Sequence, residues 1–210
     1  MTFRAAPLTP SGTLLGTLSA QGHVDGLLRI AAVLFVTALT AAAAQVSVPL
    51  PFTPVPFTLQ PMVVLLGGAV LGARLGMAAQ VLYLCIGIAG LPVFAASPVL
   101  PQGILRLLGP TGGFLLSYPL AALVAGALAQ RGFDRRYLTS FLAMAAGLGV
   151  VFACGVMWLA WFAAPAALGL STALQIGLYP FLPADLLKLC VAAAIMPAAW
   201  RFIGSARPPV

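Results

Sequence analysis

An aspartate and a lysine near the carboxyl end of the chain are the residues whose types and spacing could best do chemistry. Asp185 and Lys188 are three residues apart, so a helix places both on one face. Pro183 suits the first turn of that helix, which puts Lys188 about one turn deeper than Asp185. A carboxylate acceptor beside an ammonium donor can bind a small polar molecule at the mouth of a helix bundle. The alternative is that the two charges only neutralise each other, with Lys188 extending toward the lipid headgroups.

A second group of polar residues could face the same cavity. Arg106 lies in an apolar loop just before Gly109-Pro110-Thr111-Gly112-Gly113. A helix that starts on these glycines presents free backbone N–H groups, which suit a carboxylate. We therefore predict Arg106 and Thr111 as substrate contacts, although Arg106 could instead bind lipid phosphate. Gln80 and Tyr83 share a face of another helix and are further candidates, but hydrogen bonding between helices explains them equally well.

The elements that position these residues follow from the scarcity of charge. Of 210 residues, 10 are Lys or Arg and 3 are Asp or Glu, so 6% are charged, against about 25% in soluble domains. The hydrophobic fraction is 62%. This composition excludes a soluble enzyme, a disordered chain and a nucleic-acid-binding protein. It also makes any ionisable residue inside an apolar segment a candidate for function.

The sequence contains none of the common hydrolase motifs. It lacks a glycine-rich loop ending in Gly-Lys-Ser/Thr, and it has neither GxSxG nor HExxH. Its three cysteines and single histidine show no metal-ligand spacing. We predict a protein that is not an enzyme, with no metal and no cofactor, which binds and translocates a small molecule.

Six apolar segments approach the length of a membrane helix. They cover residues 27–46, 61–73, 75–91, 111–130, 138–163 and 181–200. The second is short and glycine-rich, so a broken or half-buried helix is an alternative there. We predict an all-α polytopic membrane protein, in which a single six-helix bundle over residues 27–203 follows an arm of residues 1–26 and precedes a tail of residues 204–210.

The distribution of basic residues predicts the orientation of the bundle. Eight of the ten lie at one side when the six segments alternate across the membrane: Arg4, Arg29, Arg74, Arg131, Arg135, Arg136, Arg201 and Arg207. The positive-inside rule then places both termini in the cytoplasm, with the protein in the bacterial cytoplasmic membrane.

Two outer loops are apolar and rich in proline. Residues 49–58 are a tandem repeat, Pro-Leu-Pro-Phe-Thr followed by Pro-Val-Pro-Phe-Thr, which predicts an extended, polyproline-like strand. Residues 91–110 form the other loop. The two loops could form a lid over a binding site, or they could be turns that rest on the headgroups.

Four motifs together resemble the biotin-specific S components (BioY family) of energy-coupling-factor transporters. They are Pro-Phe-Thr-Pro-Val-Pro at 51–56, Gly-Leu-Pro-Val-Phe-Ala at 90–95, Gly-Pro-Thr-Gly-Gly-Phe at 109–114 and Pro-Ala-Asp-Leu-Leu-Lys at 183–188. The resemblance extends from about residue 27 to residue 200.

The resemblance implies a membrane subunit that captures biotin near the outer face. It implies that a separate module drives uptake, consisting of a transmembrane coupling protein and two ABC-type ATPases. It assigns Asp185 and Lys188 to substrate binding, and Ala38 and Ala42 on the first helix to contact with the coupling protein. Two alternatives remain: an S component for another vitamin such as riboflavin or thiamin, and a structural membrane subunit that binds no small molecule.

Overall fold

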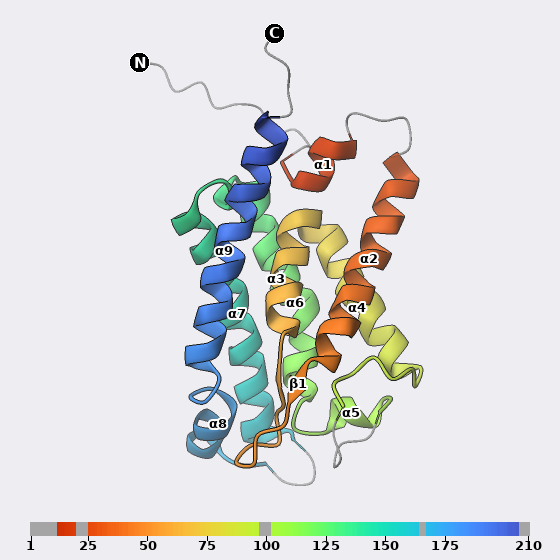
Figure 1. Ribbon diagram of the computed structural model, residues 1–210. Helices are drawn as coiled ribbons and strands as arrows, with labels where there is room; N and C mark the ends of the chain where they lie inside the picture. Colours follow the sequence, from red (N-terminus) through yellow and green to blue (C-terminus); the bar gives the residue numbers. More distant parts are fainter. Residues whose placement is uncertain (1–11, 20–24, 97–101, 164–166, 206–210) are drawn as a thin grey trace.

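Long apolar helices run side by side, and short elements cover the two ends of the bundle (Figure 1). The computed structural model describes residues 12–19, 25–96, 102–163 and 167–205. In chain order, the elements are α1 (Leu14–Ser19), α2 (Asp25–Gln45), β1 (Ser47–Val48), β2 (Phe57–Thr58), α3 (Gln60–Leu71), α4 (Ala73–Ile88), α5 (Leu105–Leu108), α6 (Gly112–Gln130), η1 (Phe133–Arg135), α7 (Tyr137–Trp161), α8 (Leu170–Gly177) and α9 (Leu182–Ser205).

Each of the six predicted segments forms one helix: α2, α3, α4, α6, α7 and α9. Within the described residues, α2, α6, α7 and α9 are long and apolar enough to cross a membrane. The 12 residues of α3 and the 16 of α4 are fewer than a span normally needs. They extend over about 18 and 24 Å, against a hydrocarbon core of about 30 Å. The all-α membrane fold is confirmed, whereas the number of six spans stays a prediction.

A single glycine connects α3 to α4 and lets the two helices pack closely. Gly72 has a φ of 85°, in the left-handed region that glycine adopts without strain. On either side of this turn, a Cβ added at Gly76 would lie 2.7 Å from the Cα of Gly68. Small residues at spacing four therefore serve packing inside the bundle.

Helix α6 lies at the centre of the bundle and packs against α3, α4 and α7. Its buried face consists largely of alanine and glycine, which allow the neighbouring backbones to approach closely. Gly126 is one such contact, because a Cβ added there would lie 2.5 Å from the backbone N of Ala73. Backbone atoms cannot move aside as a flexible side chain can.

We expect Gly126→Ala to destabilise the bundle by about 1–3 kcal/mol, because the added methyl group overlaps the α3–α4 turn. Gly149→Ala in α7 is the matched control, since a Cβ there meets nothing within 4 Å. That variant should be neutral or more stable by about 0.5–1 kcal/mol. Thermal unfolding of the two variants in detergent measures the difference, and equal melting temperatures would contradict the packing described here.

One end of the bundle carries most of the basic residues. The start of α2, the α3–α4 turn, η1 and the end of α9 lie there together with α1 (Figure 1). The start of α2 and the end of α9 thus lie at the same end of the bundle, as an even number of crossings requires. That this end faces the cytoplasm stays a prediction. Part of the predicted arm is packed, because Leu14 and Leu15 of α1 are buried. Residues 1–11, 20–24 and 206–210 of the predicted arm and tail lie outside the described residues.

The loop of residues 49–58 differs from the single extended strand predicted for it. The chain turns back on itself, and β1 pairs with β2 in antiparallel register, Ser47 with Thr58 and Val48 with Phe57. Pro49 follows β1 and Pro56 precedes β2, and these prolines confine the ladder to two residues a strand. The hydroxyl of Thr53 donates to the carbonyl of Ile176 over 2.7 Å, which ties the hairpin to α8 at the same end of the bundle.

Candidate substrate-binding site

The aspartate and lysine of α9 form a buried ion pair directed into the bundle. Lys188 Nζ donates to Asp185 Oδ1 over 2.7 Å, and only 11% and 6% of the two side chains are exposed. The ammonium also donates to the carbonyl of Thr58 over 2.6 Å and lies 3.5 Å from the centre of the Phe57 ring. These three contacts hold the ammonium against the hairpin, and binding of a ligand by the pair stays a prediction, as does the alternative that its charges only neutralise each other.

One small cavity lies beside this pair, and it shares a wall with a second cavity. The first, of about 40 Å³, is lined by Asp185 and Lys188. The second, of about 30 Å³, is lined by Arg106 and Thr111. The residues common to both are Val55, Pro56, Thr58, Phe114 and Tyr118. The hairpin and α6 thus separate a neutral ion pair at one side from an arginine at the other.

The Arg106 side chain is buried in this site, with 1% of the residue exposed. Its guanidinium donates to the carbonyl of Ala95 over 2.6 Å. Burial lowers the pKa of Arg106, and nearby Tyr83 opposes that shift. Thr111 directly precedes α6 and is 5% exposed, and its hydroxyl has no hydrogen-bond partner among the described residues. An arginine and a free hydroxyl in one cavity can bind an anionic group.

Tyr83 lies behind this site and does not line either cavity. Its hydroxyl accepts a bond of 2.7 Å from Gln60 Nε2 and donates to the carbonyl of Val93 over 3.2 Å. Its ring lies 6.5 Å from that of Tyr118. Gln60 and Tyr118 do line the cavity, so Tyr83 supports the site from the second row of side chains.

The placement of Gln80 differs from the prediction that it faces the cavity. Gln80 is completely buried, and its Nε2 donates to Thr40 Oγ1 over 3.2 Å, between α4 and α2. Thr37 makes a similar contact, donating to the carbonyl of Ala79 over 3.0 Å. A buried side-chain amide is stabilised by a hydrogen bond to a neighbouring helix, here to Thr40 of α2. This contact between helices accounts for a glutamine at position 80. The alternative of hydrogen bonding between helices therefore holds for Gln80.

Three polar or aromatic residues of the site were not predicted: Thr58, Gln60 and Tyr118. Thr58 contributes a backbone carbonyl, which no side-chain pattern reveals. Gln60 precedes an apolar segment and was readable only as a polar residue at a helix start. Tyr118 sits one residue before the proline inside α6, and an isolated tyrosine in a span is ordinary.

Ala38 and Ala42 lie on the outer face of α2, where both are exposed. Ala42 lines an apolar groove between α2 and α3, whereas Ala38 does not. This face also carries exposed Leu34, Phe35 and Leu39. A surface of this kind is available to lipid or to another membrane protein.

Comparison with known proteins agrees with this architecture. The chain is 40% identical over 167 residues to a probable biotin transporter BioY of Pyrococcus horikoshii, covering 80% of this chain and 93% of the relative. It is 41% identical over 160 residues to the biotin transporter BioY of Thermotoga maritima, covering 76% and 88%. A crystal structure of the S-component for biotin from an ECF-type ABC transporter shares the fold, with a TM-score of 0.76, 23% identity, and coverage of 86% of this chain and 94% of that chain.

These relatives are transporters, and four helices of membrane-spanning length mark this chain as a multi-pass membrane protein. The model of the BioY family matches residues 17–205, nearly the whole chain. The protein belongs to the BioY family.

Proposed function

We propose that this protein binds biotin and acts as the substrate-capturing subunit of an energy-coupling-factor transporter. One observation carries the proposal: a neutral ion pair, Asp185–Lys188, and a buried cation, Arg106, line two cavities that share one wall. Membership of the family and relatives named biotin transporters support the identity of the substrate.

The chemistry of biotin matches these two groups. Its ureido ring is neutral and presents two N–H donors and one carbonyl acceptor, which suit the carboxylate of Asp185 and the ammonium of Lys188. Its carboxylate suits a guanidinium, because arginine offers parallel donors in the geometry of a carboxylate. The apolar ring and chain would then contact Phe114 and Val55 in the common wall. We assign the ureido end to the ion pair and the carboxylate to Arg106 and Thr111.

The proposed binding requires the outer loop to move. Ligand pockets usually measure about 300–1,000 Å³, far more than the two cavities in this conformation. The hairpin of residues 47–58 covers both cavities through Val55, Pro56 and Thr58. It is held to α9 by the bond from Lys188 to Thr58 and to α8 by the bond from Thr53. We propose that the hairpin is the lid that admits and encloses biotin.

The sequence has no ATPase motif, so this chain does not itself hydrolyse ATP. We propose a transmembrane coupling protein with two ABC-type ATPases as the partner module. Ala38 and Ala42 are proposed as its contact on α2, where small exposed residues allow a second helix to approach closely. Both residues are exposed along a helix that the rest of the bundle leaves open.

Binding of radiolabelled biotin to the purified full-length protein tests the proposal directly. We expect saturable binding with a dissociation constant at or below micromolar, competed by unlabelled biotin but not by riboflavin or thiamin. Competition by one of these vitamins instead would reassign the substrate, and no saturable binding of any of the three would overturn the proposal. Biotin uptake by cells that express this chain alone, and then with a coupling module, measures the need for partners.

Gln80 provides a test of the boundary of the site. Gln80→Leu should leave the affinity for biotin within about twofold of wild type and change the free energy of unfolding by about 1 kcal/mol, because the residue pairs with Thr40 outside the cavities. Isothermal titration and thermal unfolding of the same sample measure the two quantities. A large loss of affinity at unchanged stability would return Gln80 to the binding site.

A further inference from the structure

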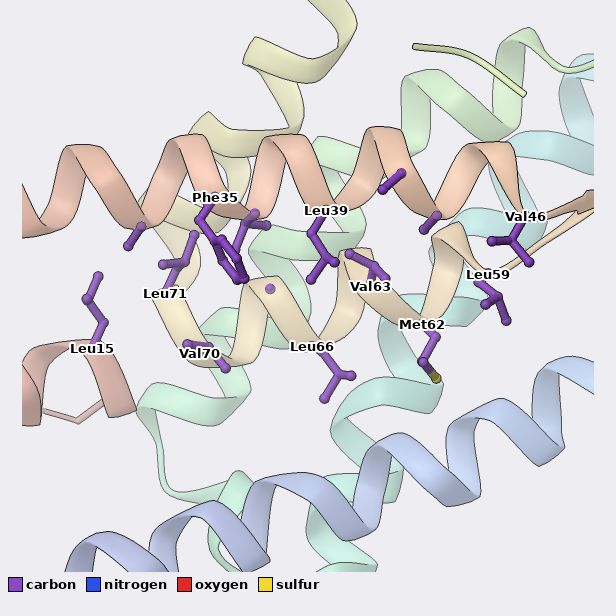
Figure 2. A pocket seen from close by; sticks show the side chains of 15 residues that line it. Leu15, Phe35, Leu39, Val46, Leu59, Met62, Val63, Leu66, Val70 and Leu71 are labelled. Atoms are coloured by element: carbon purple, nitrogen blue, oxygen red, sulfur yellow. The ribbon is translucent and has the colours of Figure 1, made fainter. Parts of the chain in front are cut away.

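An apolar groove runs along the outside of the bundle between α2 and α3. It has a volume of about 550 Å³ and is lined by side chains such as Phe35, Leu39, Val46, Met62, Leu66 and Val70. Figure 2 shows Phe35 and Leu39 pointing from α2 toward α3, with Leu15 of α1 at one end of the groove and Val46 and Leu59 at the other. Along α2, the lining residues extend from Ala32 to Ala43, about 17 Å of helix, and Val46 follows just beyond the helix. One leaflet supplies about half of the roughly 30 Å hydrocarbon core, so the groove is long enough to span it.

A second cavity with different chemistry adjoins the groove at the α1 end. Its volume is about 450 Å³, and Leu15 and Leu71 line both spaces. Arg29 of α2 and Arg74 of α4 are on its wall, together with Thr13 and Gln130. Both arginines are exposed, and no Asp or Glu is among the residues that line this cavity in the described part of the chain.

We propose that the groove and the basic cavity together form a binding site for one anionic phospholipid. The groove would hold an acyl chain, because it offers only apolar surface along a helix that faces hydrocarbon. Arg29 and Arg74 would bind the phosphate, because they lie where the helix ends meet the headgroup region and carry the opposite charge. The first turn of α4 adds to the positive potential around Arg74.

This lipid site is separate from the proposed biotin site. The basic cavity lies at the end of the bundle away from the hairpin, α5 and α8 (Figure 1). The groove extends to Val46 and Leu59 beside the hairpin, but none of its lining residues lines either cavity of the proposed biotin site. The proposal therefore does not rest on the proposed function, and the two can fail independently. Ala42 lines the groove, so a partner helix that docks on this face of α2 would displace the acyl chain.

The test measures lipid retained by the purified full-length protein. The protein is delipidated, incubated in detergent with phosphatidylglycerol or phosphatidylcholine, and analysed by native mass spectrometry. We expect wild type to form a one-to-one complex with phosphatidylglycerol. The double variant Arg29→Gln/Arg74→Gln should bind this lipid roughly tenfold more weakly, since both arginines are proposed to contact the headgroup. Arg136→Gln/Arg201→Gln removes the same charge at the same end of the bundle, outside the residues that line the cavity, and should bind like wild type.

A third variant tests the acyl chain apart from the charge. Ala32→Phe places a bulky ring at the cavity end of the groove, keeps both arginines and should weaken phosphatidylglycerol binding. An excess of inorganic phosphate should not displace the lipid, whereas displacement would reduce the site to a phosphate site. Equal retention of the lipid by wild type, the Arg29/Arg74 variant and Ala32→Phe would overturn the proposal. The melting temperature of each variant in detergent serves as the measure of folding.

Discussion

Neutralising both members of the Asp185–Lys188 pair should restore the stability that either single change removes, while binding of biotin is lost. Asp185→Asn or Lys188→Met alone leaves one buried charge without its partner, which is expected to destabilise the protein by about 3–5 kcal/mol. Replacement of a whole buried pair by neutral groups is often close to neutral for stability. The double variant should therefore fold, and its melting temperature should approach that of the wild type.

Biotin affinity of the double variant separates a binding pair from a structural pair. We expect a loss of about a hundredfold or more, because hydrogen bonds to charged groups contribute about 1.5–3 kcal/mol each and two are removed. Asp134→Asn is the matched control, since this buried carboxylate accepts a bond from Trp200 and lies beside Arg135 at the opposite end of the bundle. It should leave biotin affinity unchanged. Wild-type affinity in the double variant would mean that the pair only neutralises itself.

The features that could be predicted from the sequence depend on residues close together in the chain. The six helices were predictable because each is a continuous apolar run, and the ion pair was predictable because two charges in such a run stand out. The spacing of Asp185 and Lys188 also placed them correctly on one face. Their partner could not be predicted, because the carbonyl of Thr58 reaches Lys188 only through the hairpin. That contact joins residues 130 positions apart in the chain.

Polar residues within helices were the least predictable part of the site. Gln80 and Tyr83 lie on one face of α4, yet Gln80 pairs with Thr40 and Tyr83 with Gln60. Helical spacing predicts which residues share a face but not which neighbour that face meets, which depends on the packing of the whole bundle. The glycines at the start of α6 show the same limit. A Cβ added at Gly113 would overlap Trp158 and the carbonyl of Cys154, a close helix contact that the sequence does not reveal, and the predicted exposure of the backbone N–H groups stays a prediction.

Arg106 should determine the affinity for biotin only when the ligand carries its carboxylate. We expect Arg106→Gln to weaken biotin binding by about tenfold to a hundredfold, because a charge-assisted hydrogen bond contributes about 1.5–3 kcal/mol. Arg106→Lys should recover part of the loss, since lysine restores the charge but not the paired donors. Biotin methyl ester keeps the ureido ring and lacks the negative charge. Its affinity should hardly differ between the wild type and the two variants.

The ester is the decisive control because Arg106 also has a structural contact. Its guanidinium donates to the carbonyl of Ala95, so a substitution could loosen the loop and weaken every ligand alike. If the substitution only loosens the loop, the affinities for biotin and for its ester fall by the same factor. If it removes the carboxylate contact, only the affinity for biotin falls. The reciprocal measurement uses the double variant Asp185→Asn/Lys188→Met, which should weaken both ligands equally if the ion pair binds the ureido ring. Should the double variant discriminate between the two ligands and Arg106→Gln not, the carboxylate would lie at the ion pair and the orientation of biotin would be reversed.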